Sequence, residues 1–219
     1  MSIKTAVFAV NASPLVTDEA LFEKALAAVT PARREKAARY RKKEDAALSL
    51  AAEWLLRHAF ATAGVPFPTV FSKSAHGKPF APDCPLRYSL SHSGEWAVCA
   101  VSGNEVGCDV EKIDPAHTGV AARFYTAAEQ AQLTAVDEDE RVRRFFRIWT
   151  IKESFIKAAD AGLSLSDFSV RLGEPSAVEN ETAVFGEYTE LPGYACALCL
   201  RAGEKTPPLT VMKIGDLLK

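Results

Sequence analysis

Charged and apolar residues alternate near the middle of the chain, and this alternation constrains the fold more than any other feature of the sequence. Val106, Cys108 and Val110 occupy one set of alternating positions, and Asp109 and Glu111 occupy the other. Successive side chains of a β-strand point to opposite faces. We therefore expect a strand that buries its apolar face and holds both carboxylates together on the opposite face.

A helical pattern follows further along the chain. Apolar residues recur at spacings of three and four around Trp149 and Phe155, which is the periodicity of one helix face. Glu153 and Lys157 are four residues apart, so a helix places them on one face, with Trp149 one turn before. This helix offers a third carboxylate with a lysine beside it.

The two segments together indicate a site for a divalent cation. Mg²⁺ prefers hard oxygen ligands and usually combines a few protein carboxylates with waters and substrate phosphate oxygens. Asp109, Glu111 and Glu153 could supply the carboxylates, and Lys157 nearby favours chemistry on a phosphate ester or anhydride. Taken singly, each pair is better explained as the solvent side of a strand or a surface ion pair. Their combination favours the cation site.

Two other segments carry polar groups that could bind phosphate. His92 stands between two serines, Ser91 and Ser93, in a stretch that runs into an apolar strand, although a single histidine in a turn is more often solvated. Thr30 and Pro31 predict a helix start. The basic residues that follow, up to position 43, could equally be a solvated helix face or a nucleic-acid patch.

The wider pattern predicts an α+β fold, because helices and strands alternate without the regular spacing of βαβ units. Strands are expected at residues 4–10, 69–72, 86–90, 97–102, 106–111, 168–172 and 194–200. Helices are expected at residues 18–28, 31–63, 119–124, 127–133, 137–160 and 214–218.

Ordered motifs across residues 76–165 resemble the 4′-phosphopantetheinyl transferases of the surfactin-synthetase-activating (Sfp) type. They are His76-Gly77-Lys78-Pro79, Ser91-His92-Ser93-Gly94, residues 106–112, residues 146–157 and Gly162-Leu163-Ser164-Leu165. Their order and spacing agree with the family throughout, which makes the signal far more specific than one short motif.

The resemblance implies a reaction and a set of residues for it. The phosphopantetheine arm of coenzyme A would pass to a serine of an apo acyl or peptidyl carrier protein, with release of adenosine 3′,5′-bisphosphate and a need for Mg²⁺, or Mn²⁺ in its place. The resemblance implies that Asp109, Glu111 and Glu153 bind the metal and that Glu153, Lys157 and Asp109 are catalytic. The acceptor serine needs a general base, which could be Glu153, directly or through a water, or a metal-bound hydroxide. Contacts to coenzyme A are implied for Arg33, Lys36, Ser49, Lys78, Ser91, His92, Lys152 and Lys157.

The sequence departs from the family pattern at two positions. Ser89 stands two residues before the Ser-His-Ser motif, where the family often has asparagine. Cys108 stands where an aliphatic residue is common, and the alternation predicts that it packs on the face away from the metal.

The resemblance also implies two similar α+β halves related by a pseudo-twofold, with coenzyme A and the metal in the cleft between them. Gly103 and Asn104 form a turn signal at which the halves would divide. Residues 1–103 would contact the 3′-phosphate and adenine, and residues 104–219 would carry the metal and catalytic groups. The length of the chain favours a monomer, and the carrier is expected near residues 115–132, where Arg123, Phe124 and Tyr125 could meet it.

Composition agrees with an intracellular enzyme. The chain has 219 residues of which 48% are hydrophobic, enough for a sizeable core. Its net charge of −2 argues against a nucleic-acid binder, and no apolar run predicts a membrane span or a signal peptide. The five cysteines are expected to be free thiols, with Cys196 and Cys199 on opposite faces of one strand, which favours the cytoplasm.

Two other function classes stay open at this point. One is a coenzyme A or nucleotide-binding module without transferase activity, and the other is a nucleic-acid binder that uses the basic helix. The second would show a steep salt dependence and no metal requirement. The joint presence of Asp109, Glu111, Glu153 and Lys157 favours the enzyme, because binding alone would not require all four.

Overall fold

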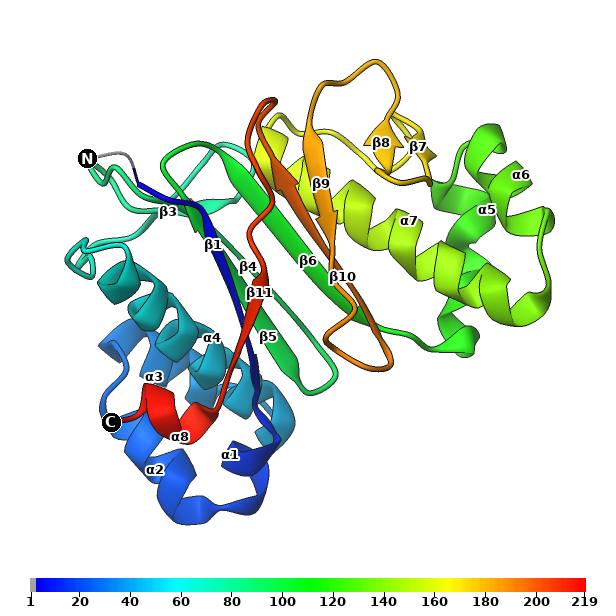
Figure 1. Cartoon of the computed structure of the whole chain (residues 1–219). Helices are drawn as coiled ribbons and strands as arrows, with labels where there is room; N and C mark the ends of the chain where they lie inside the picture. Colours follow the sequence, from blue (N-terminus) through cyan, green and yellow to red (C-terminus); the bar gives the residue numbers. More distant parts are fainter. Residues whose placement is uncertain (1–2) are drawn as a thin grey trace.

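The computed structural model describes residues 3–219 and confirms the α+β prediction: two β-sheets lie side by side, and a long helix covers each (Figure 1). The first sheet has the strand order β11-β1-β5-β4. Its strands are β1 (Ala6–Asn11), β4 (Arg87–Ser93), β5 (Trp96–Ser102) and β11 (Leu209–Met212). β1 pairs antiparallel with β5 and parallel with β11, so the end of the chain completes the sheet that its beginning starts.

The second sheet is antiparallel and has the order β6-β10-β9. Its strands are β6 (Val106–Lys112), β9 (Val184–Glu187) and β10 (Tyr194–Leu200). Two small pairs stand apart, β2 (Ser72–Lys73) with β3 (Pro79–Phe80) and β7 (Val170–Arg171) with β8 (Ala177–Val178). The predicted strand over 106–111 is therefore correct and lies next to β10.

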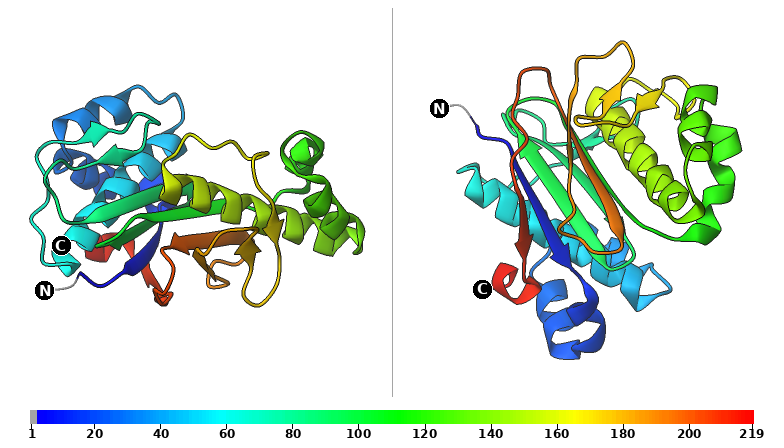
Figure 2. Two further views of the ribbon diagram at one scale, coloured as in Figure 1. Left: turned by 90° about the horizontal axis from the view of Figure 1, so that it is seen from above. Right: turned by 45° about the vertical axis from the view of Figure 1, so that its right-hand side comes forward.

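Long helices cover the outer faces of both sheets. α4 (Lys43–Thr62) packs on β1 and β5, and α7 (Glu138–Ala159) lies lengthwise on β6 and β10 (Figure 2). Around α4 lie α1 (Ser13–Thr17), α2 (Glu19–Ala27), α3 (Pro31–Ala38) and α8 (Ile214–Leu217). Before α7 come the 3₁₀ helix η1 (Pro115–Val120), α5 (Ala121–Phe124) and α6 (Ala127–Thr134).

Three apolar clusters form the core. One lies between the first sheet and its helices, and another lies between the second sheet and α7. The third joins the two sheets, because apolar residues of β1 and β5 pack there with Val106, Cys108 and Val110 of β6. The apolar set of the alternating segment is thus buried between the sheets, which leaves Asp109 and Glu111 on the face toward α7.

The helix predicted over 31–63 is wrong as a single element. Thr30 caps α3 as predicted and accepts a hydrogen bond from the backbone N–H of Arg33, but the helix ends at Ala38 and a new one begins at Lys43. Basic residues crowd the break, with Arg39 and Lys43 four apart. Like charges at this spacing destabilise a continuous helix. The strands β3, β8, β9 and β11 have no counterpart in the sequence prediction.

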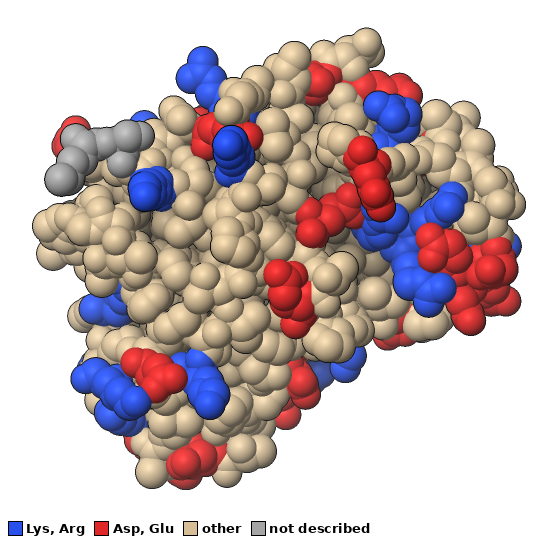
Figure 3. Space-filling view, in the orientation of Figure 1, with Lys and Arg blue, Asp and Glu red and all other residues tan. Residues whose placement is uncertain are grey.

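The charged side chains and the cysteines agree with the expectations from composition, which were a small net charge and free thiols. Basic and acidic side chains lie side by side on the face shown in Figure 3. On α7, Arg143 and Arg144 both pair with Glu140. All five cysteines are free, and Cys196 and Cys199 belong to different core clusters, as expected for opposite faces of a strand. Within residues 3–219 the helices are too short or too polar to cross a membrane.

Candidate active site

Asp109 is the central residue of the site. Its side chain is 3% exposed, and Oδ1 lies 2.6 Å from Nζ of Lys157. The same oxygen accepts a hydrogen bond from Ser91 Oγ at 2.7 Å. Oδ2 is buried and has no hydrogen-bond partner among the residues that the structure describes. Because an unpartnered buried carboxylate oxygen is costly, this atom is the natural contact for a bound cation.

Three serines at alternate positions of β4, Ser89, Ser91 and Ser93, connect the two sheets at the site; we call them the serine seam. Ser89 Oγ accepts a hydrogen bond from the backbone N–H of Cys108 at 3.0 Å. Ser93 Oγ donates to Glu111 at 2.7 Å, as Ser91 does to the other carboxylate of β6. In the described chain no backbone ladder joins β4 to β6. Hydroxyl groups therefore make the polar junction between the sheets.

Helix α7 approaches β6 very closely at Gly107. A Cβ atom on this residue would lie 1.9 Å from the carbonyl oxygen of Ser154 and 2.6 Å from the backbone nitrogen of Ala158. Only glycine allows two backbones to come this close. Glu153 and Lys157 each stand one residue before these contact points, so the approach brings both side chains to the carboxylates of β6.

The carboxylates and the lysine influence each other's protonation. Burial raises the pKa of Glu153, and the negative charge of Asp109 raises it further. Burial also raises the pKa of Glu111, against a hydrogen bond from Ser93 that lowers it. For Lys157, burial lowers the pKa, but the effects of Asp109, Cys108 and Glu153 together outweigh burial, and the net pKa is raised. The site therefore holds a cationic lysine among carboxylates that lack a full set of counter-charges.

These carboxylates do not form a closed metal cage. Across residues 3–219, no group of three or more His, Cys, Asp or Glu side chains is arranged so that it could hold a metal ion. Lys157 occupies one oxygen of Asp109, and Ser93 occupies one of Glu111. The donor set nevertheless fits Mg²⁺, since it consists of hard oxygens and one of them is unpartnered. The assignment of Asp109, Glu111 and Glu153 to the metal stays a prediction.

Basic residues from α3 gather near His92. Partial burial lowers the pKa of His92, and the positive charges of Lys36, Lys157 and, less strongly, Arg33 lower it further. Arg33 donates to Ser49 Oγ at 3.1 Å, and Ser49 is only 1% exposed. Ser49 therefore orients the guanidinium of Arg33 in this structure, and its contact with coenzyme A stays a prediction.

A cavity of about 430 Å³ extends from the turn at residues 76–79 to Lys157 on α7. Lys78 lines it, although its Nζ pairs with Glu105 at 2.9 Å and also donates to the carbonyl of Val106 at 3.3 Å. Lys78 is thus held at the start of β6. The structure brings the predicted Lys78 and Lys157 to one cavity even though they are far apart in the sequence.

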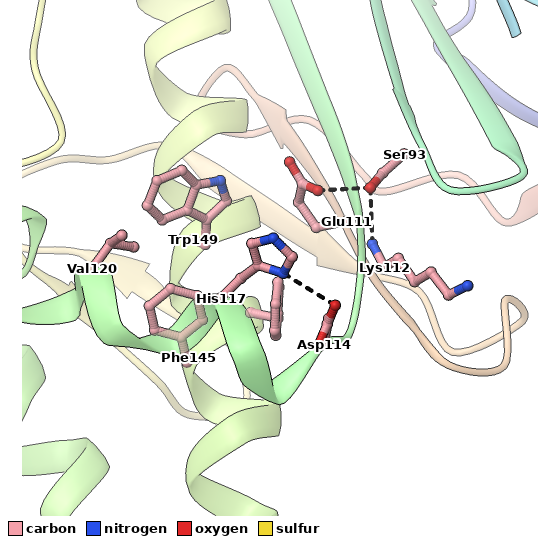
Figure 4. A pocket seen from close by; sticks show the side chains of 9 residues that line it. Ser93, Glu111, Lys112, Asp114, His117, Val120, Phe145 and Trp149 are labelled. Atoms are coloured by element: carbon pink, nitrogen blue, oxygen red, sulfur yellow. Dashed lines mark hydrogen bonds and ion pairs between the residues drawn. The ribbon is translucent and has the colours of Figure 1, made fainter. Parts of the chain in front are cut away.

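A second cavity, of about 440 Å³, is lined by Glu111 itself (Figure 4). Its wall from α7 is aromatic, with Phe145 and Trp149, and Val120 of η1 adds to it. Polar groups form the rim, where Nδ1 of His117 lies 3.1 Å from a carboxylate oxygen of Asp114. This cavity could receive an apolar or partly polar chain next to the carboxylates. Its lining residues are Ser93, Glu111, Lys112, Asp114, His117, Val120, Phe145, Phe146 and Trp149.

Comparison with known proteins assigns the family. The family model "4′-phosphopantetheinyl transferase, N-terminal" matches residues 16–104, and "4′-phosphopantetheinyl transferase superfamily" matches residues 105–199. The 4′-phosphopantetheinyl transferase Sfp of Bacillus subtilis strain 168 is 34% identical over 207 residues, which cover 90% of this chain and 92% of the relative. The chain belongs to the Sfp-type 4′-phosphopantetheinyl transferases.

Two further comparisons concern a curated relative and a solved structure. A 4′-phosphopantetheinyl transferase of Bacillus subtilis is 40% identical over 164 residues, or 73% of each chain. A solved holo-[acyl-carrier-protein] synthase of Thermotoga maritima matches 46% of this chain and 64% of its own at 20% identity. Its TM-score of 0.39 is too low to inform the fold.

Lys152 corrects one prediction for this transferase. The side chain was expected to contact coenzyme A, but it is 0% exposed and pairs with the fully buried Glu129 at 2.8 Å. It projects from α7 into the core beneath the helix, on a different side from Glu153, because neighbouring residues of a helix point in different directions. Lys152 is therefore part of the support of the site and does not line it.

The two departures from the family pattern have simple structural outcomes. Ser89, in place of asparagine, accepts the hydrogen bond from the β6 backbone described above. Cys108 is 0% exposed in the cluster between the sheets, so the prediction that it packs away from the carboxylates is confirmed.

Glu53, which organises the basic residues around Arg33 in this transferase, was not identified from the sequence. This carboxylate is 3% exposed on α4 and accepts hydrogen bonds from the N–H and hydroxyl of Thr30, from Arg33 and from Arg57. A single glutamate within the apolar half of a helix is the signal that could have found it, since a buried charge requires partners. Asp114 and His117 carried no such signal, because a short acidic loop is common on protein surfaces.

Proposed function

We propose that this transferase moves the 4′-phosphopantetheine arm of coenzyme A to a serine hydroxyl of an apo acyl or peptidyl carrier protein and releases adenosine 3′,5′-bisphosphate. The single observation that carries the proposal is the arrangement around Asp109. Among the described residues, this buried carboxylate has one unpartnered oxygen, and it interacts with two further carboxylates and a cationic lysine. Such a mixture of charges suits a pyrophosphate that arrives together with a divalent cation.

The substrate would lie along the line of these groups. Arg33, Lys36 and His92 would bind the 3′-phosphate of coenzyme A at the basic end, and Lys78 would add a contact from the cavity beside Lys157. Lys157 would lie against the pyrophosphate. Attacking and leaving oxygens lie roughly in line in phosphoryl transfer, so the acceptor serine would enter from the opposite side, through the cavity beside Glu111.

The bond changes assign a role to two residues of α7. The serine oxygen forms a bond to the β-phosphorus, and the phosphoanhydride bond to the adenosine bisphosphate breaks. Glu153 would take the serine proton, since its raised pKa makes it a better base than an ordinary carboxylate. Lys157, whose ammonium is retained by its raised pKa, would offset the negative charge on the leaving oxygen.

Asp109, Glu111 and Glu153 would hold the Mg²⁺ ion, or Mn²⁺ in its place. When bound, such an ion stabilises negative charge on the phosphate oxygens. Cation binding lowers the basicity of a carboxylate, so the two roles of Glu153 make opposing demands. Glu153→Gln separates them, because glutamine still offers one oxygen to a cation and cannot accept a proton at neutral pH.

The finer organisation is also part of the proposal. We propose two halves, residues 1–103 and 104–219, related by a pseudo-twofold; the two family models meet between residues 104 and 105, which supports the division. Each sheet also has one long helix on its outer face. The five free thiols support a cytoplasmic location, and we propose a monomer that meets its carrier near residues 115–132.

The decisive experiment is the intact mass of a purified apo acyl carrier protein after incubation with this protein, coenzyme A and Mg²⁺. We expect a gain of one phosphopantetheine that EDTA prevents and that Asp109→Asn abolishes. Cys108→Val, a change beside the site on the packed face, is the matched control and should leave most of the transfer. Coenzyme A binding without any mass gain on several unrelated carriers would instead identify a coenzyme A or nucleotide-binding module.

A further inference from the structure

The pair formed by Lys152 and Glu129 is the most deeply buried pair of charges in the described part of the chain, at 0% exposure for both side chains. The ammonium of Lys152 has three donors, and each has a partner: Glu129 at 2.8 Å, the carbonyl of Phe168 at 2.6 Å and the carbonyl of Leu165. A buried ion pair costs desolvation energy and is a poor source of stability by itself. We therefore asked what this pair holds in place.

Glu129 connects three separate segments. One of its carboxylate oxygens accepts a hydrogen bond from the backbone N–H of Val170 in β7 at 2.7 Å. The other accepts from the backbone N–H of Thr126 at 2.9 Å, which closes the capping box at the start of α6. With Lys152 on α7, the pair joins the catalytic helix, α6 and the loop after α7 at one point. A neutral or apolar side chain could not make all of these contacts.

A stack of aromatic rings leads from this pair to the cavity beside Glu111. Nζ of Lys152 lies 5.8 Å from the ring centroid of Tyr125. Tyr125 stacks on Phe145 at 5.1 Å and donates its hydroxyl to the carbonyl of Phe145 at 2.7 Å. Phe145 in turn stacks on Trp149 at 5.9 Å. Phe145 and Trp149 are the rings that form the wall of the cavity in Figure 4.

We infer that Lys152 and Glu129 are positioning residues for the acceptor side of the site, an inference that rests on the transferase function proposed above. The pair holds Tyr125 and the start of α6 against α7. Tyr125 in turn holds Phe145 and Trp149, the aromatic wall of the cavity through which the carrier serine would reach the pyrophosphate. The basic residues that would bind the 3′-phosphate belong to α3 and β4, whereas the rings of the stack belong to α7 and to Tyr125 at the end of α5. Loss of the pair should therefore disturb the use of the carrier and spare coenzyme A.

The test compares Lys152→Met with Lys24→Met, a surface control on α2, in the holo-forming assay with coenzyme A and apo acyl carrier protein. Lys152→Met is expected to raise the KM for the carrier about 10-fold or more, since displacements of 1 Å at a reacting centre cost up to about 100-fold. The dissociation constant for coenzyme A, measured by calorimetry, should change less than about 2-fold, because distant sites that share no contacts are only weakly coupled. A purely structural role would lower the melting temperature and the active fraction and leave both constants unchanged.

Tyr125→Phe is the second variant, because it removes the hydroxyl bond to Phe145 and keeps the buried pair. We expect a smaller rise in the carrier KM in the same direction. An unchanged carrier KM in folded Lys152→Met, or in Tyr125→Phe should the first variant not fold, overturns the inference.

A readout that does not depend on turnover separates this inference from the proposed function. In a Trp54→Phe/Trp96→Phe background, Trp149 is the only tryptophan left of the three in the chain. Lys152→Met should increase the quenching of its fluorescence by acrylamide, as the wall loosens. Equal quenching in both proteins refutes the positioning role even in a chain that transfers nothing, whereas inactivity of the unmodified chain refutes the proposed function alone.

Discussion

The contact between Gly107 and helix α7 gives the sharpest test of how the fold builds the site. In Gly107→Ala the new Cβ would lie 1.9 Å from the carbonyl oxygen of Ser154 and 2.6 Å from the backbone nitrogen of Ala158. Both neighbours are backbone atoms, so no side-chain rotation relieves the overlap. A return to an ordinary 3.4 Å separation moves the Ser154 carbonyl by about 1.5 Å, and with it the helix.

Two effects of different size follow. Overpacking of this kind costs about 1–3 kcal/mol of unfolding free energy, which lowers the melting temperature by several degrees, about 2–4 °C per kcal/mol, in a chain of this size. A displacement of 1 Å or more between Asp109 and the pair Glu153 and Lys157 should lower the turnover number about 100-fold. The protein is therefore expected to stay folded at 25 °C and to lose nearly all transfer.

The assay measures holo-carrier formation by intact mass, together with a thermal melt by circular dichroism. Gly215→Ala is the matched control, since this glycine lies on the exposed side of α8 with no atom within 4 Å of an added Cβ, and it should change neither quantity. A Gly107→Ala protein with unchanged melting temperature and turnover number would refute the close approach as the device that assembles the site.

Three further predictions concern single groups. Asp109→Asn should abolish transfer and leave binding of coenzyme A measurable by calorimetry, because the neutral amide no longer draws the cation or the ammonium of Lys157; detectable turnover above about 1% of the parent would contradict this role for the carboxylate. Glu153→Gln should remove turnover at every Mg²⁺ concentration, whereas rescue by excess Mg²⁺ would make Glu153 a metal ligand and not the base. His92→Ala should weaken coenzyme A binding about 10-fold, as expected for one charge-assisted hydrogen bond. Burial and the charge of Lys36 lower the pKa of His92 in the free protein, and a bound phosphate would raise it. Binding of coenzyme A should therefore take up a proton near neutral pH. Calorimetry in buffers of different ionisation enthalpy measures this uptake, which should be lost in His92→Ala.

Local periodicity was sufficient to predict the strand at the heart of the site. The alternation over β6 places Asp109 and Glu111 on one face and Cys108 on the other, and this depends only on the geometry of a strand. The helical spacing of Glu153 and Lys157 likewise needs no tertiary information. A backbone contact at Gly107 brings the strand and the helix together, and the pattern of side chains does not predict this contact.

Lys152 shows where such reasoning stops. In the sequence it stands next to Glu153, and a lysine beside a predicted site carboxylate is a natural candidate for a phosphate contact. Its true partner, Glu129, lies in another helix, and the pairing depends on how α6 packs on α7. The prediction also missed β9 and β11, which are only four residues long, and β11 pairs with β1 at the opposite end of the chain. Contacts between remote segments decide such positions.

The serine seam has a consequence for the stiffness of the molecule. Ser91 and Ser93 bind the same carboxylates, Asp109 and Glu111, on which a phosphate-bound cation would draw. Each hydrogen bond to a charged group contributes about 1.5–3 kcal/mol, and it weakens when a ligand withdraws charge from the acceptor. Binding of a ligand at the site should thus weaken the serine–carboxylate hydrogen bonds that hold the two sheets together. Backbone amides along the seam would sense a bound substrate by hydrogen exchange before any distant part of the chain does.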